Sequence, residues 1–101
     1  MSFVLAFAYR VDGGGEEEFE RVYGPRGEWA ALFARADGYL GTELHRSVET
    51  PGAYLVLDRW SDAAAHRAFL AEHGAEYERR AAGTAALYDG EERLGAFEAV
   101  A

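Results

Sequence analysis

Four stretches of the chain have the hydrophobic and polar pattern of β-strands. The alternation with a period of two is clearest in the first stretch, where aromatic and branched residues dominate. The predicted strands are 3–11, 39–49, 53–60 and 93–100. A short Thr-Pro-Gly turn at 50–52 joins the second and third stretches, so these two are predicted to form an antiparallel hairpin.

Between the strands, apolar residues recur every three or four positions, which predicts helices. Phe19, Val22 and Tyr23 share one helical face, and a second helical segment is predicted over 28–36 after a Gly-Pro interruption. Ser61 is predicted to cap a helix over 62–73. Gly74 is predicted to end that helix, with a further turn or two over 75–82.

The order of these elements is β-α-β-β-α-β. This order is typical of an α+β, ferredoxin-like domain, in which two helices cover one face of a four-stranded antiparallel sheet. With 101 residues, the whole chain is predicted to form one domain.

Both faces of the predicted sheet are apolar, although two helices cover only one face. The first strand carries apolar side chains at odd and at even positions: Phe3, Leu5, Phe7 and Tyr9 against Val4, Ala6 and Ala8. An exposed apolar face of this size is typical of an interface. We therefore expect a homodimer that packs sheet to sheet with twofold symmetry. The alternative is that loops or segment 84–90 cover the second face.

Composition and charge exclude several classes of partner. The chain has a net charge of −8, and its ten basic residues are scattered arginines, so we expect neither nucleic acid nor an anionic membrane as a partner. It has no cysteine, which excludes disulfides and thiol chemistry. No apolar run is long enough to span a bilayer and no signal peptide is evident, so the expected location is the cytoplasm.

Three segments together resemble the antibiotic biosynthesis monooxygenase domain family of the dimeric α+β barrel superfamily. They are residues 23–29 (YGPRGEW), 38–44 (GYLGTEL) and 54–60 (YLVLDRW), with Phe69, Leu70 and Tyr77 further along. The resemblance implies a dimer whose two sheets form a barrel, and a small-molecule pocket between sheet and helices. For some members it implies oxidation of polycyclic aromatic substrates by O2 with no metal, flavin or haem. We therefore expect no cofactor.

The resemblance also suggests site residues. Trp60 matches a Trp at the end of the third strand in the cofactor-free oxygenases, His66 stands where they have a Tyr, and Arg80 loosely matches an Arg. Val56 stands where they have an Asn that is expected to touch the substrate. Phe69 falls at the position of a helix Trp in the haem-degrading branch, and is a predicted substrate-binding residue.

Asp58 is a candidate site residue on physical grounds. It stands among Val56, Leu57 and Trp60, where a carboxylate needs a hydrogen-bond or ion-pair partner. It is predicted to accept a proton or hydroxyl from a ligand that stacks on Trp60. The alternatives are a structural ion pair of Asp58 with Arg10 or Arg46, and plain core packing for Trp60.

The histidines are the remaining candidates. His66, His73 and Tyr77 fall on one side of a helix if Gly74 does not break it, and would line the mouth of a pocket. His66 and His73 are separated by about 10.5 Å along such a helix, too far to share a metal ion, so no metal site is predicted. His45 shares the parity of Tyr39 and Glu43 in its strand and is a candidate base or proton shuttle. Ordinary surface positions are the alternative for all three histidines.

These observations lead to one leading hypothesis and two rivals. The first is a cofactor-independent oxygenase that acts on an aromatic or phenolic substrate, with Trp60, His66, Arg80 and Asp58 as catalytic residues. The second is a non-catalytic dimer that binds a small hydrophobic molecule. The third is a purely structural dimer whose pocket is filled by its own side chains, such as Phe7, Trp29 and Phe69.

Overall fold

The computed structural model describes residues 2–100, and its strands pair in the order β2-β3-β1-β4, each antiparallel to its neighbour. The strands are β1 (Phe3–Arg10), β2 (Tyr39–Arg46), β3 (Ala53–Trp60) and β4 (Gly90–Glu98). This pairing confirms the predicted hairpin and the ferredoxin-like α+β fold. β4 begins three residues before the predicted start.

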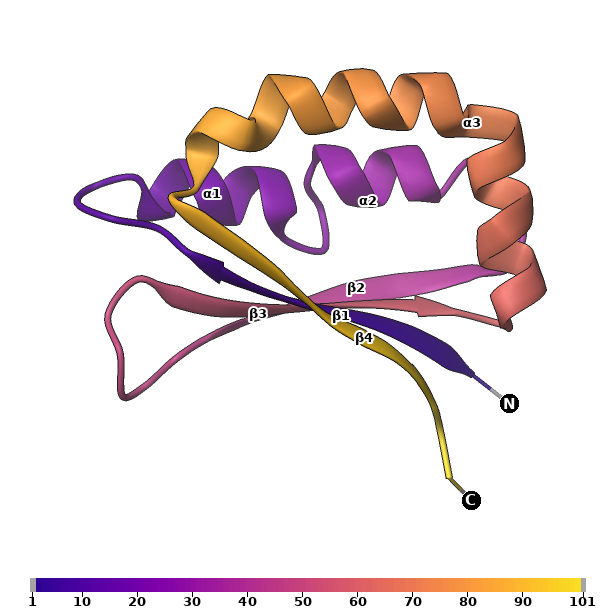
Figure 1. The fold of residues 1–101 in the computed structure, drawn as a ribbon, viewed down its shortest axis with the longest axis horizontal. Coiled ribbons are helices and arrows are strands. Elements are labelled where there is room, and N and C mark those ends of the chain that lie inside the picture. The colour runs from indigo at the N-terminus through magenta and orange to yellow at the C-terminus, as the bar shows by residue number, and fades with distance from the viewer. Residues whose placement is uncertain (1, 101) are drawn as a thin grey trace.

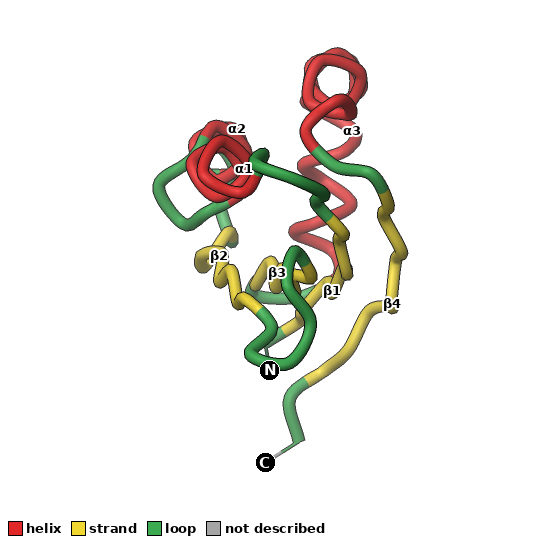
Figure 2. Tube along the Cα trace, turned by 90° about the vertical axis from the view of Figure 1, so that its left-hand side faces the viewer, coloured by secondary structure: helices red, strands yellow, loops and turns green. Residues whose placement is uncertain are grey.

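The helices lie on one face of the sheet (Figure 1). They are α1 (Glu16–Tyr23), α2 (Glu28–Phe33) and α3 (Ala63–Thr84), followed by a short 3₁₀ turn, η1 (Ala85–Leu87). Seen along the sheet, α1 and α2 lie one behind the other, and α3 runs beside them over the β1–β4 side (Figure 2). In residues 2–100, no helix combines the length and hydrophobicity needed to cross a membrane.

Helix α3 differs from the prediction at its start and in its middle. Ser61 is not the N-cap: its backbone N–H donates to the Gly38 carbonyl, and the Asp62 carboxylate accepts from the Ala65 N–H at 2.8 Å instead. Gly74 does not end the helix, which continues past a kink at His73 (φ −117°, ψ 17°). A glycine inside a helix costs only about 1 kcal/mol, and packing offsets that cost here, because Phe69 and Tyr77 on either side both pack against the core.

Aromatic side chains dominate the core between sheet and helices. Trp60, Phe19 and Phe69 are the largest of the fully buried side chains. The opposite face of the sheet has no helix over it, and apolar residues occupy its centre: Val4, Ala6, Ala8, Leu55, Leu57 and Phe97. Segment 84–90 does not cover this face, since Tyr88 packs against Tyr9 and Tyr23 on the helix side, so that alternative is wrong.

Two β-bulges change which side chains face the helices. In β2 the register shifts between Tyr39 and Gly41, and in β4 it shifts opposite Ala6 and Phe7. Gly41 (φ +138°) and Gly95 (φ +141°) supply the backbone conformation at these points, which other residues rarely adopt. Each bulge reverses the alternation beyond it, so residues of equal parity in one strand lie on opposite faces.

The bulge in β2 corrects the prediction for His45. Tyr39 pairs with Trp60 and lies on the helix side, whereas Glu43 and His45 pair with Leu57 and Leu55 on the open face. His45 therefore does not share a face with Tyr39. In β4, Glu91 and Arg93 pair with Tyr9 and Phe7 and face the helices, while Phe97 faces the open side.

Candidate functional site

A cleft with two compartments lies between the sheet and the helices. The small compartment has a volume of about 120 Å³ and the large one about 360 Å³. They share four lining residues: Phe7, Phe33, Asp58 and Tyr77. Because their walls are common, we treat them as one cleft. Of the three residues predicted to fill such a pocket, Phe7 and Trp29 line the cleft, and Phe69 does not.

Asp58 lies on the wall between the two compartments and is 7% exposed. Its carboxylate accepts a hydrogen bond from Thr42 Oγ1 at 2.7 Å, and the Thr42 hydroxyl is in turn 2.6 Å from the Tyr39 hydroxyl. Burial raises the pKa of Asp58 to about 6, and the hydrogen bond from Thr42 opposes this only in part. A carboxyl group with such a pKa changes its protonation state close to neutral pH.

Asp58 has no ion-pair partner among residues 2–100, so the predicted pairing with Arg10 or Arg46 is wrong. Arg10 lies 3.8 Å from Asp12, and Arg46 lies 2.7 Å from Glu20. In the register of the sheet both arginines stand beside residues 53 and 54, four or five positions along β3 from Asp58. That is about 13–17 Å at 3.3 Å per strand residue, beyond the reach of an ion pair.

Trp60 and His66 meet in the large compartment. Trp60 is fully buried, and its indole Nε1 has no hydrogen-bond partner in the part of the chain that the structure describes. The His66 ring packs edge-on against it with 5.2 Å between centroids. Burial, assisted by the positive charge of Arg93, lowers the pKa of His66 from its ordinary value and so favours the neutral imidazole.

The other predicted site residues are distributed unevenly around the cleft. Tyr77 lines both compartments. Phe69 lies in the core behind the cleft wall, 5.5 Å from the Trp60 ring, and His73 packs on Phe69 at 5.4 Å. Neither Phe69 nor His73 lines the cleft, and His45 lies on the opposite face of the sheet.

Arg80 also lies outside the cleft. One helical residue corresponds to about 100° of rotation, so Ala81 faces the small compartment and Arg80 points toward α2. The Arg80 guanidinium donates to the Glu28 carbonyl oxygen at 3.2 Å and to the Glu76 carboxylate at 3.4 Å. The structure therefore brings together Trp60, His66, Asp58 and Tyr77, and leaves Arg80 between two helices.

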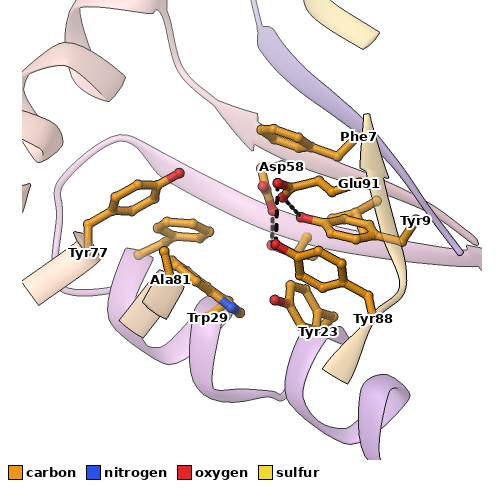
Figure 3. A pocket seen from close by; sticks show the side chains of 12 residues that line it. Phe7, Tyr9, Tyr23, Trp29, Asp58, Tyr77, Ala81, Tyr88 and Glu91 are labelled. Carbon is orange, nitrogen blue, oxygen red and sulfur yellow. Dashed lines mark hydrogen bonds between the residues drawn. The ribbon is translucent and has the colours of Figure 1, made fainter. Parts of the chain in front are cut away.

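Several polar and aromatic residues of the small compartment were not predicted (Figure 3). The Tyr9 hydroxyl donates to Glu91 Oε2 at 2.7 Å, and the Tyr88 hydroxyl lies 3.4 Å from Glu91 Oε1. The Tyr23 hydroxyl donates to Thr84 Oγ1 at 3.0 Å. The alternation in β1 does place Tyr9 on the face of Phe7, but the position of Glu91 depends on the bulge in β4.

A comparison with family models identifies one family for this chain. The family model described as antibiotic biosynthesis monooxygenase matches residues 2–80. A mutant of SnoaB, a cofactor-independent oxygenase from Streptomyces nogalater, is 30% identical, with a TM-score of 0.77 over 97% of this chain and 92% of that chain. A mutant of MhuD, solved with two manganese protoporphyrin IX molecules per active site, is 26% identical, with a TM-score of 0.71 over 98% and 95%.

A third structure, from Pseudomonas aeruginosa, is 21% identical, with a TM-score of 0.65 over 99% of this chain and 95% of that chain, and supports the fold alone. Among curated protein sequences there is no significant match.

Proposed function

The chain belongs to the antibiotic biosynthesis monooxygenase family, and from that premise we propose that it is a cofactor-independent monooxygenase acting on an aromatic or phenolic substrate in the two-compartment cleft. The observation that carries the proposal is Asp58, a buried carboxyl group on the wall that both compartments share, which has no ion-pair partner among residues 2–100. The description of SnoaB as a cofactor-independent oxygenase supports it.

Asp58 is the proposed base. A general base is most effective when its pKa lies near the working pH, and burial raises the pKa of Asp58 to about 6. It takes a proton from the activated carbon or hydroxyl of the substrate and leaves an electron-rich anion in the cleft. Thr42, which donates to the carboxylate, holds it in place.

The substrate itself then supplies the electrons for O2. For an anthrone, the carbanion forms a C–O bond with O2, and Asp58 returns its proton to give the hydroperoxide. Loss of the remaining proton at that carbon and cleavage of the O–O bond release water and leave the quinone. One oxygen atom of O2 stays in the product and the other leaves as water, so the overall reaction is balanced.

The remaining cleft residues bind and orient the substrate. We propose that the unpaired Trp60 Nε1–H donates to an oxygen of the substrate anion, and that the neutral His66 imidazole exchanges a proton beside it. The apolar lining keeps water away from the anion. Arg80, which bridges α2 and α3, positions the helix that carries Tyr77.

Oxygen uptake tests this function. With anthrone, 1,8-dihydroxyanthrone and naphthohydroquinones as substrates, a chelator present and no added flavin, we expect protein-dependent O2 consumption above the autoxidation rate. Asp58→Asn is expected to lower kcat at least about 100-fold. Asp37→Asn, at an exposed carboxylate, is the matched control and should keep full activity. Binding of these compounds without O2 consumption would contradict the proposal and favour the non-catalytic ligand-binding alternative.

We further propose that the functional unit is a homodimer formed through the open face of the sheet. Leu55 and Leu57 lie at its centre beside Ala6 and Ala8, and Phe97 is 53% exposed at its edge. Burying apolar side chains of this kind stabilises association by roughly 25 cal/mol per Å² before the entropic cost of pairing. A second copy with the same apolar face is the self-complementary partner.

Light scattering at micromolar concentration checks this dimer. The wild-type protein is expected to have twice the 11.1 kDa chain mass. Leu57→Glu places a charge at the centre of the face and should give a monomer, whereas Val48→Glu, at a fully exposed position in the β2–β3 connection, should leave the mass unchanged. An 11.1 kDa wild-type species would overturn the dimer.

A further inference from the structure

The lining of the small compartment is aromatic and acidic. Seven of its twelve lining residues are aromatic, and the two charged ones are Asp58 and Glu91. Although the chain contains ten arginines and three histidines, none of them lines this compartment. Asp58 also borders the large compartment, which Arg93 and His66 line, so Glu91 is the carboxylate that belongs to the small compartment alone, and it forms no ion pair within residues 2–100.

The negative charge of Glu91 affects the pKa values of the tyrosine hydroxyls that line the small compartment. Burial is the main reason that the pKa values of Tyr9, Tyr23 and Tyr77 are raised, and the charge of Glu91 raises all three further. The same causes raise the pKa of Tyr88. Burial disfavours a charge of either sign, but the Glu91 contribution depends on sign and favours a cation over an anion at this wall.

Aromatic rings add a second reason. A quaternary or tertiary ammonium group is attracted to the faces of Trp and Tyr rings, by about 0.5–2 kcal/mol for each favourable contact. Cages of aromatic side chains with a nearby carboxylate are the usual sites for such groups, because methylated ammonium is large, weakly hydrated and positive. A volume of about 120 Å³ suits one compact head group.

Trp29 adds a poorly satisfied polar group to this wall. The residue is 9% exposed and lines the small compartment, and its Nε1–H has no acceptor in good hydrogen-bonding geometry within residues 2–100. The Tyr23 hydroxyl, which donates to Thr84, lies near enough for this N–H to lower its pKa, but the N–H does not point well at it. A poorly aligned donor gains free energy when an oxygen atom of a ligand accepts from it.

We propose that the small compartment binds a methylated ammonium group between its aromatic side chains, Glu91 and Asp58, with an oxygen of the same ligand accepting from Trp29. The substrate class follows from this site and rests on the proposed function: it is a phenol that carries a cationic amine. The phenol ring lies in the large compartment. The bound cation then keeps Asp58 in the ionised form that a base requires.

A matched pair of probes tests the cation site without any turnover. Choline and 3,3-dimethylbutan-1-ol have the same shape and the same hydroxyl, and differ in a positive nitrogen against a neutral carbon. Calorimetry or ligand-observed NMR at pH 7.5 is expected to show choline binding about tenfold more tightly. Equal or weaker binding of choline, or no choline binding at all, would overturn the proposal.

Two variants test whether the preference for choline over the neutral probe arises in the small compartment. Glu91→Gln keeps an acceptor for the Tyr9 hydroxyl and is expected to weaken choline binding about tenfold, with the neutral probe unaffected. Glu49→Gln makes the same change in net charge at an exposed position in the β2–β3 connection and should alter neither affinity more than twofold. Equal losses in the two variants would assign the preference to overall charge and refute the site.

If Glu91→Gln does not fold, the comparison of choline with the neutral probe in the wild-type protein still tests the cation site. Oxygen uptake is read separately, so a protein that prefers choline but consumes no O2 would refute the oxygenase and keep the cation site. The opposite result would refute the cation site alone.

Discussion

Asp58→Asn is expected to make the protein more stable at pH 8 while it abolishes activity. The pKa of Asp58 is about 6 in the folded protein, because burial raises it from its ordinary value of 3.8. At pH 8 the folded state therefore holds a buried carboxylate that the unfolded state holds in water. A shift of about two pKa units corresponds to about 3 kcal/mol, and relaxation reduces the net gain to about 2 kcal/mol.

The pH dependence has a definite direction. Between pH 4 and pH 6 the folded state binds a proton at Asp58 that the unfolded state has released, so the free energy of unfolding falls as the pH rises through this range. The stabilising contribution of protonated Asp58 is fully present below pH 4 and is lost above pH 6. Carboxylates with lowered pKa values, such as Glu20 and Glu43, act in the opposite direction.

The difference between wild type and variant isolates Asp58 from these other groups. Denaturant unfolding at pH 4.0 and pH 8.0, at one fixed protein concentration, should give nearly equal stabilities at pH 4.0 and a more stable variant at pH 8.0. The melting temperature at pH 8.0 should rise by on the order of 10 °C. A variant that is less stable than wild type at pH 8.0 would show that the carboxylate is well compensated in the folded protein.

Substitutions at Trp60 are expected to separate packing from chemistry. Trp60 is fully buried and packs against Phe33, Tyr39 and Phe69 with centroids 5.3–5.6 Å apart. Trp60→Ala removes these contacts and should destabilise the protein by about 3–5 kcal/mol, enough to unfold much of a domain of this size. Loss of activity in that variant would say nothing about catalysis.

Trp60→Phe is the informative change, because it keeps an aromatic ring and removes the unpaired Nε1–H. We expect a folded protein whose kcat/KM falls at least about tenfold, because the donor to the substrate anion is gone. Phe69→Leu, in the core but outside the cleft, is the control for a loss of stability alone and should retain kcat/KM at a temperature where it is folded. Full activity in Trp60→Phe would leave Trp60 a packing role only.

The fold could be predicted because its signals are local. Alternation in β1 and β3, the short turn at 50–52 and the aromatic faces of α1 and α2 each follow from neighbouring residues, and the structure agrees with all of them. The error at Gly74 arose because a glycine weakens a helix only slightly, and the packing of Phe69 and Tyr77 is a tertiary effect that no local pattern contains.

The site was predicted only in part, for a geometric reason. Asp58 was identified because an acid in an apolar strand has few explanations, and Trp60 and His66 lie close to it as expected. His45 was misjudged because a bulge at Leu40 reverses the alternation in β2, and Glu91 was missed because β4 begins at Gly90, before the predicted strand 93–100. Arg80 was taken from a loose match, and a rotation of one helical residue moves it out of the cleft.

Labelling with ¹⁸O2 tests the central claim most directly. Wild-type protein treated with chelator, without added flavin or metal, is incubated with an anthrone under ¹⁸O2, and the quinone is analysed by mass spectrometry. The account predicts one ¹⁸O atom in each quinone formed by the protein, and loss of protein-dependent product in Asp58→Asn. Protein-dependent product without ¹⁸O, or product that appears only after a flavin or metal is added, would contradict it.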